Sequence, residues 1–347
     1  MDILSRLLHT RFIIKIRNWE YWPFGIIHAP LFIYWLWLSL KARSFTFFSA
    51  SNPGILMGGM FGESKYEVME KVPASVKPKT LRMEVPTTPE KVLGEITRQG
   101  LIFPVIFKPD LGERGWRVKK ISCAEDIAPY LKLINMPFLV QEYVSLPLEF
   151  GVFYVRYPSE PCGRVVSIVG KEMLSVNGDG HSPLSRLILQ NDRAKLQWEV
   201  LADGYRHRLD EVLPVGERLE LVSIGNHCLG TKFLNANHLI NDKLSASFDV
   251  ISRQIDGFYF GRFDLRTASI ADLEEGRVMV MELNGCGAEP AHIYDPGFSL
   301  LKAIRVLFRH WHDIYRVSYE NHLRGTPYIS FREARSIYQR FKTLTAS

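Results

Sequence analysis

Two stretches of this sequence read FYFGRFDLR (residues 258–266) and VMVMELN (residues 278–284). Both consist mainly of apolar and aromatic residues, which favour β-strands. Polar side chains interrupt them at Asp264 in the first stretch and at Glu282 and Asn284 in the second. Carboxylate and amide oxygens are hard ligands that suit Mg²⁺, whereas carboxylates buried without a cation are costly. The two stretches therefore predict strands that carry either a magnesium site or a structural salt bridge.

An earlier stretch places a cation at the end of an apolar segment. Residues 102–107 read IFPVIF and are followed by Lys108, and a loop with Gly112 and Gly115 comes next. A cation beside exposed backbone N–H groups forms a cradle for phosphate. A lysine at the end of a strand is more often simply solvated, so this feature alone leaves both interpretations open.

Further segments complete a mixed fold. Apolar runs rich in β-formers predict strands, and segments with helical spacing or capping signals predict helices. Clusters of strands separated by helices are typical of an α+β fold with two sheet-bearing lobes. The further expected strands cover residues 116–121, 138–144, 150–157 and 164–169, and the expected helices cover residues 63–72, 89–99, 124–133, 216–231, 244–255, a long stretch from Leu300 and a last helix from Ser330.

Taken in order, these elements resemble the ATP-grasp superfamily, and especially its D-alanine–D-alanine ligase-like branch, roughly over residues 63–296. The ordered set K…KP…QEY…E…RxD…ExN is much harder to meet by chance than any single motif. The resemblance implies an ATP-grasp fold, in which two α/β lobes with antiparallel sheets sandwich a nucleotide. It also implies ATP and Mg²⁺ (or Mn²⁺) as cofactors.

The resemblance gives a role to each matching residue on the nucleotide side. Residues 142–144 resemble the hinge that reads adenine, Glu149 resembles the ribose-binding glutamate, and Lys171 resembles a lysine on the phosphate side. Arg114 stands in the loop GERGWR, which departs from the family's small hydroxyl residues and places Glu113 beside the phosphates. The expected nucleotide-binding residues are Lys65, Lys108, Gly112, Arg114, Gly115, Gln141, Glu142, Tyr143, Val144, Glu149 and Lys171.

The same resemblance suggests the catalytic groups. Arg262 is expected to stabilise a developing oxyanion. The expected metal ligands are Asp264, Glu282 and Asn284. His292 is a candidate base because an unperturbed imidazole titrates near neutral pH, and the alternative is that its segment caps the final helix. His181 ends the loop NGDGH (residues 177–181), which some members place near the γ-phosphate, and its role is equally open.

The implied reaction is an ADP-forming ligation. A carboxylate is activated as an acylphosphate and then joined to an amine, a thiol or a similar nucleophile. A kinase-like phosphotransferase and a catalytically idle nucleotide-binding module are the alternatives. The first 62 residues are too few for the Rossmann-like domain that often binds the acid in this family, and the chain reads CGAEPAHIYDPG after ELNG. The family's acceptor amino acid is therefore not carried over.

The N-terminal part has a different character. Residues 21–40 contain no charged side chain, although Pro23 and Pro30 interrupt a helix and His28 would be costly inside a bilayer. The first 43 residues hold six Lys or Arg against two Asp or Glu, so most of the net charge of +6 lies there and a nucleic-acid-binding body is not indicated. Aromatic residues and basic flanks favour a monotopic or re-entrant membrane anchor. A true span and a buried hairpin or oligomer contact are the alternatives.

The expected organisation follows these features. Gly58 and Gly59 lie in a loop that either binds an anion or only turns. Four widely spaced cysteines without CxxC spacing indicate reduced thiols in a cytosolic protein.

We expect a cytoplasmic enzyme, peripheral or monotopic at the inner face of the membrane. Its expected partners are small-molecule or lipid-linked carboxylate and amine substrates, with no nucleic acid, and a homodimer is one option. The expected divisions are a membrane-associating segment (1–50), a lead-in region (51–100), an ATP-grasp domain (101–320) and a C-terminal helix (321–347).

Overall fold

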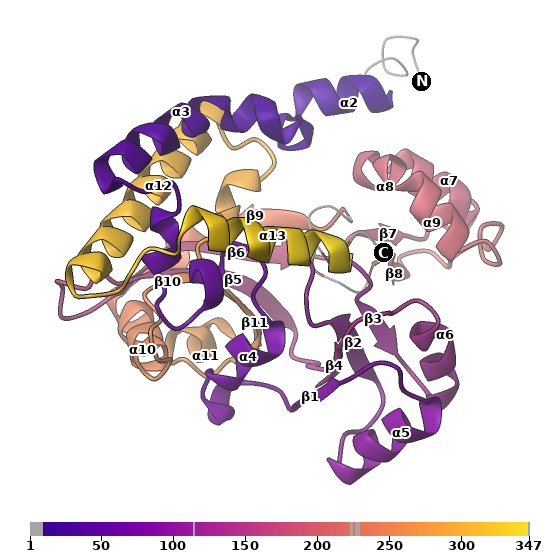
Figure 1. Ribbon diagram of the computed structural model, residues 1–347. Coiled ribbons are helices and arrows are strands. Elements are labelled where there is room, and N and C mark those ends of the chain that lie inside the picture. Colours follow the sequence, from indigo (N-terminus) through magenta and orange to yellow (C-terminus); the bar gives the residue numbers. More distant parts are fainter. Residues whose placement is uncertain (1–9, 114, 223–224, 226–229, 346–347) are drawn as a thin grey trace.

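The computed structural model describes residues 10–113, 115–222, 225 and 230–345. Two antiparallel sheets form the centres of two lobes (Figure 1). The larger sheet has the strand order β11-β10-β5-β6-β9, and the smaller has the order β1-β4-β2-β3. The strands are β1 (Thr80–Met83), β2 (Val105–Pro109), β3 (Lys119–Ile121), β4 (Phe138–Glu142), β5 (Leu148–Val155), β6 (Arg164–Glu172), β9 (Lys232–Asn235), β10 (Phe260–Thr267) and β11 (Met279–Asn284). The predicted α+β class is confirmed.

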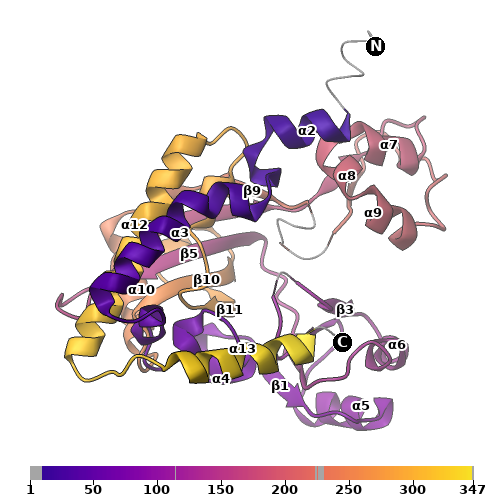
Figure 2. The ribbon, with the colours of Figure 1, turned by 45° about the horizontal axis from the view of Figure 1, so that its top comes forward.

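Helices cover both sheets and extend the chain at each end. α10 and α11 pack on one face of the larger sheet and α12 on the other, while α5 and α6 cover the smaller sheet. α3 runs beside α12 in both views (Figure 1 and Figure 2). The helices are α2 (Arg11–Arg17), α3 (Phe24–Ala42), α4 (Lys65–Glu70), α5 (Pro89–Arg98), α6 (Ile127–Leu131), α7 (Leu184–Gln190), α8 (Asp192–Leu196), α9 (Trp198–Gly204), α10 (Asp242–Arg253), α11 (Ile270–Glu274), α12 (Leu300–Leu323) and α13 (Phe331–Thr345), with short 3-10 turns η2 (Phe47–Ala50) and η3 (Leu56–Gly59).

Alternation along β10 separates core residues from charged residues. Phe263 and Leu265 pack into the core beneath α10 and α11. Successive side chains of a strand point to opposite faces, so Arg262, Asp264 and Arg266 face the other side. A one-residue slip would turn these charges into the apolar core and remove Phe263 and Leu265 from it, whose burial contributes roughly 1.5–3 kcal/mol each. The pattern FGRFDLR therefore fixes which face of the larger sheet is charged.

The smaller sheet follows the same logic. Phe107, Tyr130 and Phe138 make ring contacts at 5.1–5.5 Å in its core. Lys108 and Gln141 each follow a core residue along their strands and therefore face away from that core. The polar face of each sheet therefore lies toward the other lobe.

α3 is held against α12 on one side only. Ile27 and Leu31 pack in a cluster with Leu307 of α12. The helix begins after Pro23 and continues through Pro30, so neither proline stops it. The N-terminal helical segment predicted from the sequence is confirmed as a helix.

A small hairpin stands beside the larger sheet. It consists of β7 (Ser175–Asn177) and β8 (Arg218–Glu220), with α7, α8 and α9 packed around its own core. The helix predicted over residues 216–231 is wrong at its start, because Leu219 pairs with Val176 in the β7–β8 ladder. Pairing with a distant strand overrides the local helical spacing here.

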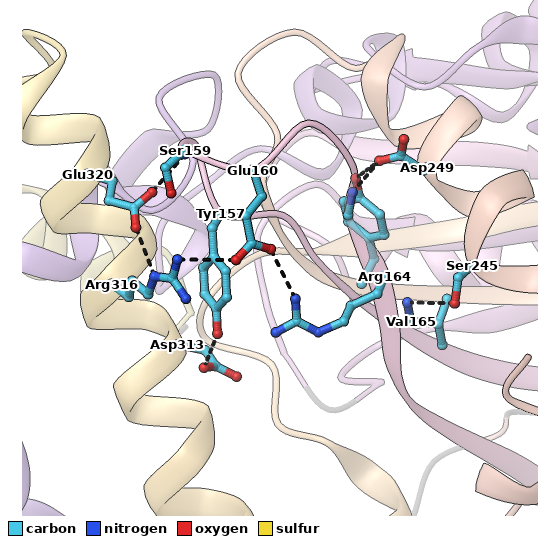
Figure 3. Close-up of polar contacts among 12 residues, drawn as sticks. Tyr157, Ser159, Glu160, Arg164, Val165, Ser245, Asp249, Asp313, Arg316 and Glu320 are labelled. Carbon is cyan, nitrogen blue, oxygen red and sulfur yellow. Dashed lines mark hydrogen bonds and ion pairs between the residues drawn. The ribbon is translucent and has the colours of Figure 1, made fainter. Parts of the chain in front are cut away.

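The turn between β5 and β6 is tied to α12 by polar contacts (Figure 3). Arg316 lies 3.2 Å from Glu160, and its guanidinium stacks over the Tyr157 ring at 3.6 Å. The Tyr157 hydroxyl donates to Asp313, and the Ser159 N–H donates to Glu320 at 2.8 Å. These contacts fix the position of α12 on the sheet.

The glycine pair before α4 makes a close backbone contact. A Cβ on Gly59 would lie 2.6 Å from the Gly285 Cα, and the φ of Gly59 is 77°. The Cys286 N–H donates to the Gly58 carbonyl at 3.0 Å. Packing of two backbone segments therefore accounts for these glycines, in keeping with the turn interpretation.

The predicted domain boundaries stay predictions. β1 and α5 belong to the smaller sheet and its core, although they lie within the predicted lead-in of residues 51–100. At the C-terminal end, α12 continues to Leu323 and α13 begins at Phe331.

Candidate active site

The charged face of the larger sheet carries the predicted metal ligands side by side. Asp264 and Glu282 stand opposite one another in the β10–β11 ladder, and Arg262 stands opposite Asn284. The Asn284 amide donates to Asp264 at 2.9 Å. Gly151 of β5 lies opposite Asp264, and a Cβ there would lie 3.2 Å from its Oδ1. A glycine at this point leaves room for the Asp264 carboxylate.

Two cations bind Asp264. Arg262 Nη2 lies 3.0 Å from its Oδ2, and Lys171 Nζ lies 3.1 Å from its Oδ1. Burial opposes ionisation of this carboxyl, but the charges of Arg262 and Lys171 outweigh it and lower the pKa of Asp264 to about 2. Asp264 is therefore a carboxylate at any physiological pH.

Glu149 bridges two further cations. Its Oε1 lies 3.2 Å from Lys171 Nζ, and its Oε2 lies 2.9 Å from Arg266 Nη2. Arg266 also donates to the Val144 carbonyl at 3.0 Å. The ribose-binding role of Glu149 stays a prediction. Arg266 is a site residue that the sequence reasoning missed, although its spacing of two from Asp264 places it on the same face of β10.

Lys65 connects the loop at Gly112 to Glu282 of β11. Ser64 caps α4 by accepting the Glu67 N–H, which places Lys65 at the first position of the helix. Its Nζ lies 2.9 Å from Glu282 Oε1 and donates to the Gly112 carbonyl at 2.6 Å. Burial opposes ionisation of Glu282, but Lys65 and Lys108 hold its pKa below the ordinary value. Gly115 lies in the same loop, and Arg114 falls outside the described residues.

Lys108 reaches across from the smaller sheet. Its Nζ donates to Gln141 Oε1 at 3.1 Å and to the Met281 carbonyl at 3.0 Å. An ammonium group has three protons, so these two neutral acceptors leave one proton over. Within the described ranges no carboxylate lies at ion-pair distance from Lys108. Burial is the main reason that its pKa falls to about 8.

These contacts join into one cluster with an excess of positive charge. Five cationic side chains meet three carboxylates, an excess of two positive charges, and within the described residues Lys108 is the one of the five that has no carboxylate at ion-pair distance. A buried charge without a partner is costly, and an anion between the sheets would relieve that cost. The cations are Lys65, Lys108, Lys171, Arg262 and Arg266, and the carboxylates are Glu149, Asp264 and Glu282.

The donor set fits a hard divalent cation. Asp264, Glu282 and Asn284 supply only oxygen ligands, as Mg²⁺ and Mn²⁺ prefer. Among the described residues no three carboxylate, imidazole or thiolate groups converge, so the amide of Asn284 is needed to complete the set. Glu63 stands nearby, since Glu282 is among the charges that raise its pKa after burial. Its buried Oε2 accepts no hydrogen bond in the described part of the chain.

The hinge residues lie at the edge of this cluster. Gln141 is buried and donates from its Nε2 to the Met281 carbonyl at 3.2 Å. Glu142 accepts the Lys79 N–H at 3.2 Å. Tyr143 lies beneath Lys120, whose Nζ is 4.3 Å from the ring centroid. Their role in reading adenine stays a prediction.

The two candidate histidines lie apart from the cluster. His292 is buried, and its Nδ1 lies 2.7 Å from the Ser167 hydroxyl. Burial lowers its pKa to about 4, so the ring is neutral at physiological pH. His181 is exposed and contacts Asp179 in its own loop. In the residues that the structure describes, no contact joins either histidine to the cluster, and both catalytic roles stay predictions.

A second connection, which sequence reasoning missed, links α3 to Arg262. His28 Nε2 lies 2.7 Å from Glu289 Oε1, and the Tyr294 hydroxyl donates to Glu289 Oε2 at 2.6 Å. The Glu289 carbonyl accepts a hydrogen bond from Arg262 at 3.1 Å. In the sequence His28 counted only as a cost for a simple membrane span, and the fold gives it Glu289 as a partner. No signal in the sequence relates two residues 261 positions apart.

No family model and no curated protein matches the chain. Among solved structures it is similar to the D-Ala:D-Ser ligase VanG from Enterococcus faecalis, at 13% identity over 74% of this chain and 62% of that chain, with a TM-score of 0.41. It is also similar to the D-alanine–D-alanine ligase from Bacillus anthracis (11% identity, 79% of this chain, 71% of that chain, TM-score 0.41). A third is a bifunctional glutathione synthetase from Pasteurella multocida (16%, 71% of this chain, 35% of that chain, TM-score 0.36).

The chain spans less than two thirds of the VanG ligase. Likenesses of this size concern the fold alone and say nothing of substrates. The two antiparallel sheets, with the motif residues on their facing strands, fit the two-lobed arrangement that the ATP-grasp resemblance implies.

Proposed function

We propose that this chain binds ATP with a divalent cation, preferably Mg²⁺, between its two sheets. The observation that carries the proposal is the excess of cations in the cluster. Lys108 has a spare proton and no carboxylate partner at ion-pair distance in the described ranges, so a polyphosphate would meet an unsatisfied cation there. Asp264, Glu282 and Asn284 would hold the metal. When bound, Mg²⁺ neutralises charge on the β- and γ-phosphates.

The proposed reaction is a ligation through an acylphosphate. A carboxylate oxygen attacks the γ-phosphorus, the bond from that phosphorus to the bridging oxygen breaks, and ADP leaves. An amine or similar nucleophile then attacks the carbonyl carbon, and the bond to phosphate breaks as inorganic phosphate leaves. Arg262 would stabilise the tetrahedral oxyanion, because a guanidinium donates to developing negative charge. The nucleophile loses its proton to a base or to solvent.

Nucleotide binding and turnover are tested separately. Titration calorimetry with Mg²⁺ and a non-hydrolysable ATP analogue should show one site, and Lys108→Met should weaken it about tenfold or more. Cell extract incubated with protein and Mg·ATP should yield a new adduct by mass spectrometry, with Glu282→Gln as the inactive control. Equal ATP turnover by Glu282→Gln and the wild type would contradict the metal assignment.

The alternatives give different products. A ligase forms ADP, phosphate and an adduct only when both substrates are present, whereas a kinase-like enzyme leaves a stable phosphorylated product. A catalytically idle module binds the analogue and gives neither. The intact set of Arg262 and the three oxygen ligands weighs against the idle module, and the products separate the ligase from the kinase-like enzyme.

The second part of the proposal places this site at a membrane surface. α3 is long and apolar enough to cross a bilayer by length and composition. One face packs on α12, so we propose that the helix lies in one leaflet and does not cross it. Exposed basic side chains flank it, as anionic lipid would favour. The exposed apolar residues of the outer face are Ile26, Phe32, Ile33, Leu36, Trp37 and Leu40, and the basic residues are Arg11, Lys15, Arg17, Lys41 and Arg43.

Vesicle sedimentation tests this placement. The protein should sediment with phosphatidylglycerol vesicles more than with phosphatidylcholine vesicles, and the double variant Ile33→Glu with Leu40→Glu should stay in solution. Val250→Glu is the matched control, because Val250 is an exposed apolar residue on α10. Sedimentation of the double variant at the wild-type level would refute the docking face. Protein that high salt and alkali leave in the membrane would indicate a span instead.

A further inference from the structure

An apolar cavity of about 270 Å³ lies beneath the first half of α13. Its walls come from α3 and the loop after it, from η2 and η3, and from α13. Phe48, Met57 and Ala334 are buried in these walls. The hydroxyl of Thr46 in the lining is already donated to the Ile329 carbonyl, and the other polar side chains of the lining, Arg335 and Tyr338, come from α13. A ligand in this cavity would therefore meet hydrocarbon and aromatic rings.

The cavity is continuous with the outer face of α3. Phe32, on that face, stacks on Trp35 with ring centroids 5.3 Å apart. Trp35 lines the cavity and contacts Phe45 at 5.9 Å. Around the opening Phe45, Phe331 and Tyr338 are exposed by 50%, 68% and 44%. Exposed aromatic side chains next to an apolar cavity are typical of a binding site for an apolar ligand.

The charge on α13, beside the opening, is net positive. α13 carries Arg332, Arg335, Arg340 and Lys342 against Glu333. Arg335 also lines the cavity, and its guanidinium has no ion pair or hydrogen bond with the described parts of the chain. A cation at the mouth of a hydrocarbon-lined cavity complements an amphiphile with a negative head and an apolar tail.

We propose that this cavity binds the hydrocarbon tail of an anionic membrane amphiphile, with its headgroup beside Arg335. The occupant is a lipid because the cavity wall continues into the surface proposed above to meet the bilayer. The inference rests on that membrane contact for the source of the ligand, but it does not depend on the ligase reaction.

A soluble probe separates this site from vesicle binding. Dodecyl phosphate, used below its micelle concentration, should bind in a one-to-one complex by titration calorimetry. Hexyl phosphate should bind at least tenfold more weakly because it buries fewer methylene groups. Inorganic phosphate should not compete, and dodecyltrimethylammonium should bind more weakly than dodecyl phosphate. Competition by inorganic phosphate would show an ordinary phosphate site and overturn the proposal.

Variants locate the probe. Ala334→Trp fills the cavity and should weaken dodecyl phosphate at least tenfold. Arg335→Gln should weaken it by up to about fivefold, the scale of an exposed ion pair, while Arg332→Gln one turn earlier on α13 should stay within twofold. Equal affinity in Ala334→Trp and the wild type would overturn the proposal. So would light scattering that shows two chains closing over the cavity in place of the probe.

Two further measurements keep the result interpretable. Dodecyl phosphate brominated at its tail should quench the fluorescence of Trp35. The quenching should fall in Trp35→Phe, which removes the indole but keeps an aromatic ring in the cavity wall. Binding of the Mg·ATP analogue should be unchanged in Ala334→Trp and Arg335→Gln, so a failed tail site and a failed nucleotide site give different results. Undiminished quenching in Trp35→Phe would place the probe elsewhere and refute the site.

Discussion

His28 Nε2 lies 2.7 Å from Glu289 Oε1, in an ion pair that joins α3 to the loop after β11. The backbone oxygen of Glu289 accepts a hydrogen bond from Arg262. The helix that we propose to meet the membrane is therefore two contacts away from the guanidinium proposed to stabilise the oxyanion. Through these two contacts the N-terminal segment helps to hold Arg262 in position, in addition to lying near the site.

Replacing His28 should slow turnover without changing nucleotide binding. His28→Ala removes a hydrogen bond between partly buried charged groups, a loss of roughly 1.5–3 kcal/mol, and leaves Glu289 free to shift with Arg262. We expect turnover of the identified substrate to fall about tenfold, while the dissociation constant of the Mg·ATP analogue stays within twofold. His312→Ala is the control, since His312 lies half-exposed on α12. Parallel losses of turnover and nucleotide affinity would contradict this role.

Replacing Asp264 should separate metal dependence from nucleotide affinity. Asp264→Asn removes the carboxylate that Arg262 and Lys171 share. Mg²⁺-dependent turnover should fall roughly a hundredfold, because a metal ligand is lost. In excess chelator the ATP analogue should bind several-fold more tightly, because Arg262 loses its carboxylate partner and Lys171 keeps only Glu149. Glu275→Gln on the surface should change neither quantity. Weaker metal-free binding in Asp264→Asn would mean that the nucleotide does not meet these cations.

Nucleotide affinity should depend on pH through Lys108. Because its pKa is about 8, Lys108 is protonated well below pH 8 and loses its positive charge as the pH rises above that value. An anion favours the ammonium, so binding above pH 8 takes up a proton and weakens by up to tenfold for each pH unit. Calorimetry between pH 7 and pH 9.5 should show this fall, and Lys108→Met should remove it. Lys91→Met, at an exposed position of α5, should retain the wild-type profile. A flat wild-type profile would exclude Lys108 as an anion ligand.

What the sequence predicted depended on the range of the contacts. The alternation in β10 is local, so the charged face with Arg262 and Asp264 was predictable from a few residues. The partnership of His28 with Glu289 depends on how α3 packs on α12, and no local pattern encodes that packing. The strand at Leu219 was missed for the same reason, because Val176 pairs with it from the other side of α7 to α9. Family resemblance brought Lys65, Lys108 and Lys171 to one site, which spacing alone did not.

The contact between the two glycine segments should be sensitive to a single methyl group. Gly59→Ala would place a Cβ 2.6 Å from the Gly285 Cα at a φ of 77°. Overpacking and a left-handed backbone together should lower the free energy of unfolding by roughly 2–5 kcal/mol. Gly94→Ala in α5 is the matched control, since its Cβ meets nothing within 4 Å, and it should raise stability by about 0.5–1 kcal/mol. Urea denaturation of both variants tests the difference. Equal stability of Gly59→Ala and the wild type would show that the two segments can separate freely.

A buried histidine on α12 should make stability depend on pH. His310 contacts Phe153 and Phe260 at 5.4 Å and 5.2 Å, and burial lowers its pKa to about 4 from an ordinary 6.5. Between these two values the unfolded chain binds a proton that the folded chain does not, so stability falls as the pH drops through this window. From pH 7 to pH 5 this histidine alone should cost about 2 kcal/mol. His310→Leu should reduce the loss measured by urea denaturation by that amount, whereas His312→Leu at a half-exposed position should leave it unchanged. If His310→Leu loses as much stability as the wild type over this range, then His310 is protonated in the folded protein and its ring is not held neutral by the core.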